Sequence, residues 1–99
     1  MSVYDVLAQA IEKRRVVTFT YDGCFRVVEP FLLGTTTAGR PALRGYQTKG
    51  GSKSGTVPGW HLFSLDKIGG IAMIQESFAG ERTWYNPVDK AMSTIGPHV

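Results

Sequence analysis

Cysteine is nearly absent from this 99-residue sequence, in which Cys24 is the single one. One thiol cannot form an internal disulfide, and such usage is typical of a protein kept in a reducing cytoplasm, where we expect this one. A structural zinc site needs four ligands, and Cys24 with two histidines does not supply them. We therefore expect no disulfide, no metal and no cofactor.

Long hydrophobic runs are also missing. No apolar stretch approaches the ~20 residues that cross a bilayer. The N-terminus, MSVYDVLAQAIEKRR, carries its basic residues after its apolar ones, so it does not read as a secretory signal. A chain of 99 residues with 42% hydrophobic content can bury one modest core. We expect one domain over residues 1–99, without membrane contact.

Acidic residues are scarce in the middle of the chain. The net charge is +3, but the stretch from residue 40 to 67 carries +4 and the remainder −1. Within that stretch Asp66 is the one acid, against Arg40, Arg44, Lys49, Lys53 and Lys67. A local field of this sign favours anionic partners. The alternative is a basic surface that contacts only solvent.

The first 15 residues have the pattern of a helix. Ser2 and Asp5 have the spacing of a capping box. Apolar residues recur at helical spacing, and a basic run then complements the negative end of the helix dipole. These apolar residues are Val3, Leu7, Ala10 and Ile11.

Residues 16–78 have the alternation and composition of short strands. VVTFTY (16–21) and CFRVVEPFLL (24–33) flank Asp22-Gly23, a favoured hairpin turn, and Pro30 predicts a kink or the end of a strand ladder. ALRGYQT (42–48), WHLFSLDKI (60–68) and IAMIQESF (71–78) follow, separated by a long basic loop at 49–59 and by Gly69-Gly70 as a turn. About five strands in so short a chain predict a small antiparallel barrel that closes on itself.

The last segment, residues 79–99, is predicted to be an extension with a short helix. Asn86 would cap it, and Pro87 would take the first helical position. The apolar residues that support this helix are Val88, Ala91, Met92 and Ile95. The predicted fold is therefore mostly β, with a helix at each end.

The order of these segments resembles that of a WYL domain. The matching stretches over residues 8–78 are AIEKRRVVTFTYDG, FRVVEPFLLG, GRPALRGYQ and WHLFSLDKIGGIAMIQESF. The resemblance implies an Sm-like or SH3-like barrel preceded by a helix, and a bacterial regulatory module linked to transcription or phage defence. The name-giving Trp-Tyr-Leu appears here as Pro41-Ala42-Leu43, and His61 and Lys67 stand where the family often has arginine.

The resemblance also implies that basic and aromatic residues bind single-stranded nucleic acid or a nucleotide-like anion. Arginine offers paired donors to phosphate, and tyrosine rings offer faces for bases. The residues carried over are Tyr21, Arg26, Arg44, Tyr46, His61 and Lys67. Asp66 is expected to pair with one of these cations, and Arg26 could instead be neutralised by Glu29 or Asp66.

A second function class remains open. The chain could be a protein-interaction adaptor or a homo-oligomerisation module that has lost the ligand site, docking through a strand edge onto a copy of itself or a partner with a DNA-binding or effector domain. We do not expect an enzyme, because Cys24 and His61 lack an identifiable third group that would orient them.

Overall fold

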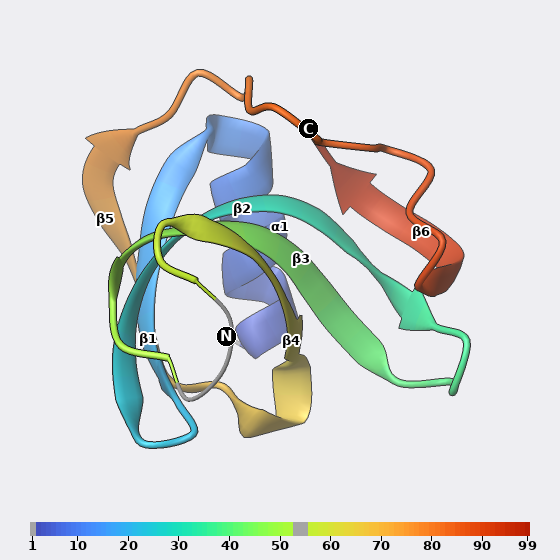
Figure 1. Ribbon diagram of the computed structural model, residues 1–99, viewed down its shortest axis with the longest axis horizontal. Helices are drawn as coiled ribbons and strands as arrows, with labels where there is room; N and C mark the ends of the chain where they lie inside the picture. Colours follow the sequence, from blue (N-terminus) through green and yellow to red (C-terminus); the bar gives the residue numbers. More distant parts are fainter. Residues whose placement is uncertain (1, 53–55) are drawn as a thin grey trace.

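The computed structural model describes residues 2–52 and 56–99, which form one α-helix, six strands and a short 3-10 helix. In chain order these are α1 (Val3–Lys13), β1 (Arg15–Tyr21), β2 (Cys24–Thr36), β3 (Pro41–Gly50), β4 (Gly59–Ser64), η1 (Leu65–Lys67), β5 (Gly69–Ser77) and β6 (Met92–His98). The prediction of a mostly-β fold with an N-terminal helix is confirmed (Figure 1). Lys53, one of the predicted loop cations, lies outside the described residues.

The N-terminal helix forms through the predicted capping box. The Ser2 hydroxyl accepts a hydrogen bond from the Asp5 amide, and the Asp5 carboxylate accepts one from the Ser2 amide. The helix ends at Lys13 because Arg14 takes a left-handed conformation (φ 55°), and Arg15 already begins β1. The buried face of α1 consists of Leu7, Ala10 and Ile11, as the spacing predicts.

A single antiparallel sheet has the strand order β4-β3-β2-β1-β5. The Asp22-Gly23 turn, with φ of 52° and 75°, joins β1 to β2 as predicted. The long strand β2 pairs with β1 through its first half and with β6 through its second half, from Leu32 to Thr36. Its direction changes just after Pro30, where Phe31 is an extra residue between two β3 partners, so the proline marks a bulge and not the end of the ladder.

The expectation of a closed barrel is wrong. Among the described residues, the outer strands β4 and β5 do not pair with each other, so the sheet stays open. The chain connection between β4 and β5 also differs from the prediction. Strand β4 ends at Ser64, η1 makes the turn, and Gly69 and Gly70 belong to β5. Within the described residues, β4 and β5 therefore each keep one unpaired edge.

The C-terminal helix is absent, and this prediction is also wrong. The side chain of Asn86 accepts from the Val88 amide and that of Asp89 accepts from the Ala91 amide, two local turns that compete with helix formation. Residues 92–98 then form β6, which satisfies the free half of β2. We call residues 79–91, which lie between β5 and β6, the C-terminal segment (Figure 1).

The two faces of the sheet are covered differently. Helix α1 packs on one side, the helix face, against an apolar core that contains Val17, Phe19, Val28, Leu43 and Phe63. The other side, the aromatic face, gathers Val16, Phe31, Tyr46, Trp60, Phe78 and Tyr85. Tyr85 comes from the C-terminal segment, which thus covers part of this face. Within the described residues, no helix is long and apolar enough to span a membrane.

Candidate functional site

The pairing of β3 with β4 separates the predicted ligand residues onto two faces. Tyr46 lies directly opposite Trp60, and Gly45 lies opposite His61. Directly paired residues share a face, and successive residues alternate between faces. Tyr46 and Arg44 therefore project to the aromatic face, whereas His61 projects to the helix face together with Phe63.

Arg26 lies on the helix face and is almost fully buried, with 3% of its surface exposed. Its Nη1 donates to Oε1 of Gln47 (3.3 Å), and its Nη2 donates to the Tyr21 carbonyl (3.0 Å). The guanidinium carbon lies 5.2 Å from the Tyr21 ring centroid and 5.7 Å from that of Phe63. Cation–π contacts and two neutral acceptors thus hold this cation in place.

No carboxylate pairs with Arg26 among the described residues, and its Nε has no hydrogen-bond partner there. The expected partner Glu29 binds Arg82, and Asp66 approaches Arg40. A buried charge without a counter-ion costs free energy, and a buried unpaired donor adds to that cost. Neutral acceptors and the rings of Tyr21 and Phe63 are therefore the contacts that hold this buried cation.

A pocket of about 210 Å³ opens beside Arg26. His61 also borders this pocket, where its Nε2 lies 3.0 Å from the Thr56 carbonyl oxygen and its ring stacks on Phe63 (centroids 5.8 Å apart). We call this the Arg26 pocket; its lining is Tyr21, Asp22, Arg26, Ser52, His61, Leu62 and Phe63. Three of the six predicted ligand residues therefore come together here, namely Tyr21, Arg26 and His61.

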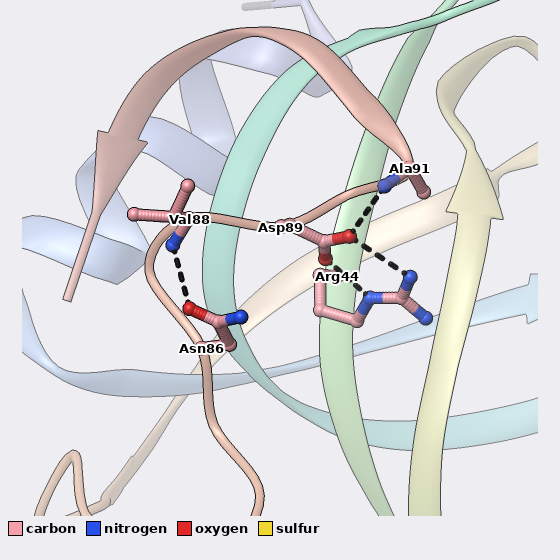
Figure 2. A network of polar contacts seen from close by, with 5 residues as sticks. All are labelled: Arg44, Asn86, Val88, Asp89 and Ala91. Carbon is pink, nitrogen blue, oxygen red and sulfur yellow. Dashed lines mark hydrogen bonds and ion pairs between the residues drawn. The ribbon is translucent and has the colours of Figure 1, made fainter.

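Arg44 lies on the aromatic face and is paired within the chain. Its Nε donates to Oδ2 of Asp89 at 2.7 Å and its Nη2 to Oδ1 at 3.3 Å, a forked contact that Figure 2 shows beside the Ala91 amide. The hydrogen bond from Arg44 lowers the pKa of Asp89, although burial of the carboxyl acts in the opposite direction. Asp89 is therefore ionised at neutral pH and occupies the place where an anion would meet Arg44.

Tyr46 also lies on the aromatic face, beneath a second ion pair. The guanidinium of Arg82 lies 4.2 Å from the Tyr46 ring centroid and donates twice to the buried carboxylate of Glu29, at 2.8 Å each. The hydrogen bond to Glu29 raises the pKa of Arg82. The ion pair joins the C-terminal segment to β2.

Trp60 connects these contacts. Its ring packs edge-on against Phe31 and Tyr46 and lies nearly parallel to Tyr85, at 5.9 Å and 18°. Its indole nitrogen donates to the Thr83 carbonyl (2.8 Å). Burial raises the pKa of Tyr85, whose hydroxyl donates to the carbonyl of Val99. The aromatic face is therefore held by rings and by ion pairs together.

Lys67 joins neither group. It is exposed in η1 and does not line the Arg26 pocket. Its neighbour Asp66 makes a loose contact with Arg40 at 3.9 Å, both side chains being mostly exposed, and not with Lys67, Arg44 or Arg26 as expected. The described residues also contain no group of three or more metal-ligating side chains.

Sequence reasoning missed Gln47, Arg82, Tyr85 and Asp89. Gln47 is a fully buried amide that binds Arg26 and two backbone carbonyls, from Lys49 and Gly51. Its position on the inward side of a strand was a usable signal, because a buried polar group needs partners. The other three come from a segment whose predicted helix does not form.

The geometry defines the fold class first: an open, six-stranded antiparallel sheet with an N-terminal helix. No known family profile matches the chain, and no curated protein matches it. Among solved structures, it is similar to part of proteasome accessory factor B/C (PafBC) of Arthrobacter aurescens, with a TM-score of 0.67 and 20% identity over 86% of this chain. The chain spans only 13% of that protein. The likeness concerns the fold and is consistent with a WYL-like one.

Proposed function

We propose that this chain is a WYL-like regulatory module that senses single-stranded nucleic acid or a nucleotide by binding a phosphate in the Arg26 pocket. The observation that carries the proposal is Arg26, a buried guanidinium that lacks a carboxylate partner within the described residues and borders an open pocket. Phosphate oxygens accept from guanidinium donors in short, charge-assisted hydrogen bonds. A bound phosphate would therefore accept from the guanidinium and compensate its charge.

The size of the pocket limits what can enter. Pockets that enclose whole small molecules occupy about 300–1,000 Å³, whereas this one measures about 210 Å³. One phosphate group with part of its sugar is a suitable occupant, and the base would lie outside. Tyr21 lies against the guanidinium and keeps it oriented before the ligand arrives.

A direct test compares AMP with adenosine by calorimetry and measures the anisotropy of a labelled single strand at low and high salt. We expect AMP but not adenosine to bind, and strand affinity to fall as salt rises. Arg26→Gln should weaken both at least about tenfold, as loss of one charge-assisted contact predicts. Arg40→Gln, which removes an exposed arginine, is the matched control.

Circular dichroism must show that Arg26→Gln is folded before its affinity is compared. Equal binding of AMP and adenosine, or unchanged affinity in a folded Arg26→Gln variant, would reject the Arg26 pocket as a phosphate site. Lys67→Gln in the same series tests whether Lys67, another of the predicted ligand residues, contributes to binding. Because Lys67 is exposed, we expect only a weak electrostatic contribution.

Protein interaction is the second candidate function, and the sheet edges favour it. In the part of the chain that the structure describes, β4 and β5 each pair on one side only. Such an edge can add a strand from a second copy or from another protein that carries a DNA-binding or effector domain. Light scattering that shows a stable dimer, together with no AMP binding, would favour this function over the first.

A further inference from the structure

The aromatic face carries a second cation, Arg44, whose position in the fold differs from that of Arg26. It lies on the opposite side of the sheet, and the chain itself supplies its anion. The contact is two-pronged, with both carboxylate oxygens of Asp89 facing the guanidinium (Figure 2). Arginine binds phosphate in the same forked geometry as carboxylate, so the two anions are interchangeable here in shape and charge.

The same segment also places a planar ring on the sheet. Tyr85 lies nearly parallel to Trp60, at 5.9 Å between centroids, four residues before the carboxylate that meets Arg44. An anion on a guanidinium and a ring on an indole are the two contacts that a nucleotide makes with a basic and aromatic surface. The C-terminal segment therefore reproduces on this face the contacts of a nucleotide.

The segment bridges the sheet without filling the space around it. One cavity of about 240 Å³ borders Arg44, Trp60 and Asp89, and another of about 540 Å³ borders Tyr46, Trp60 and Arg82. Trp84 lines both cavities and is 87% exposed, so this large ring contributes little to burying the face. The segment contains no helix or strand, and it is held by side-chain contacts and by a backbone hydrogen bond from the Thr37 amide to the Ala91 carbonyl.

From these observations we propose that the aromatic face is a second nucleotide site, formed by Arg44 and Trp60, which the C-terminal segment covers as an internal ligand. Asp89 holds the anion position, Tyr85 holds the base position, and an incoming nucleotide displaces both. The inference goes beyond the Arg26 pocket and does not require it, because the two sites share no residue.

The experiment titrates AMP into the Asp89→Asn variant and into the unaltered chain. Removing the carboxylate charge frees Arg44, so AMP should bind the variant at least about tenfold more tightly, or with one additional site. The double variant Asp89→Asn with Arg44→Gln should return to the behaviour of the unaltered chain. Asp66→Asn is the matched control, because it removes an aspartate whose arginine contact is long and exposed.

Amide hydrogen exchange supplies a readout that does not depend on affinity. The Ala91 amide donates to Oδ1 of Asp89, so its exchange reports whether the segment is seated (Figure 2). In the unaltered chain, millimolar AMP should accelerate Ala91 exchange at least about threefold, and the acceleration should persist in Arg26→Gln but vanish in Arg44→Gln. This measurement also decides the case in which Asp89→Asn does not fold.

The outcomes separate the two sites. AMP affinity of a folded Asp89→Asn variant within twofold of the unaltered chain, or Ala91 exchange that AMP slows or leaves unchanged, overturns the internal-ligand proposal. Loss of AMP binding in Arg26→Gln alone, with Ala91 exchange unaffected by AMP, supports the Arg26 pocket and rejects the second site. The converse result supports the aromatic face and rejects the pocket.

Discussion

The two faces of the sheet are covered by different physical means. Helix α1 presents Leu7, Ala10 and Ile11 to the helix face, and all three are buried. The C-terminal segment holds the aromatic face through the Arg44–Asp89 and Arg82–Glu29 ion pairs and through Tyr85. Apolar burial is nondirectional and does not respond to charge screening, whereas ion pairs depend on geometry, pH and screening. One cover is thus part of the apolar core, and the other depends on charge.

The largest expected loss of stability follows from a substitution in helix α1, which covers the helix face. Leu7→Ala removes a fully buried side chain of α1 and should lower the free energy of unfolding by about 2–5 kcal/mol. Urea unfolding at low and high salt measures it, and the loss should be the same in both. Val88→Ala in the exposed part of the C-terminal segment is the control and should stay within about 0.5 kcal/mol of the unaltered chain.

A smaller loss should follow from breaking the ion pair of the aromatic face. Arg82→Ala leaves the Glu29 carboxylate, which is 8% exposed, without its cation. Breaking a fully buried pair costs about 3–5 kcal/mol. Since the Arg82 side chain is 36% exposed, we expect about 1–3 kcal/mol. If Glu29→Gln combined with Arg82→Ala is no more stable than Arg82→Ala alone, the unpaired carboxylate is not the cause.

The stability that the Arg44–Asp89 ion pair contributes should depend on pH. Arg44 faces Asp89 from β3, and Tyr85 and Lys90 lie beside it in the C-terminal segment. Since the pKa of Asp89 is lower in the folded chain, its stabilisation is complete above the ordinary aspartate value of 3.8 and is lost as pH falls through the lower folded value. The stability difference between the unaltered chain and Asp89→Asn, about 1 kcal/mol at pH 7, should shrink below that range. A difference that stays constant to pH 2 would contradict the assigned role of Arg44.

The smallest expected loss of stability follows from a substitution at the N-cap of helix α1. Ser2→Ala removes the hydroxyl that accepts from the Asp5 amide and should cost about 0.5–1 kcal/mol. Ser2→Asp keeps an acceptor at the cap and should recover most of the loss. Thermal unfolding of the three proteins is sufficient, and AMP displacement of the C-terminal segment should be unchanged in each.

Local signals predicted the parts of the fold that local interactions form. The capping box, the apolar stripe of α1 and the Asp22-Gly23 turn all appear as expected, because each needs only residues a few positions apart. The predicted C-terminal helix failed for both a local and a nonlocal reason. The Asn86 and Asp89 side chains form local turns, and residues 92–98 pair as β6 with the free half of β2.

The candidate sites show the same difference between what local and nonlocal interactions decide. The sequence predicted arginine and aromatic residues as ligand residues, and three of the predicted residues, Tyr21, Arg26 and His61, line one pocket. It could not place Arg44 on the opposite face, since this depends on the register between β3 and β4. Nor could it identify Asp89 as its partner, 45 residues further along the chain.

The sequence by itself determined the secondary structure of the first half and the chemistry of the side chains, because helix caps, hairpin turns and alternation act over a few residues. The tertiary structure alone decided which cation stays without a carboxylate and which is neutralised. That choice depends on strand register and on the path of residues 79–91, because two charges interact strongly only where the fold brings them within a few ångströms and away from water.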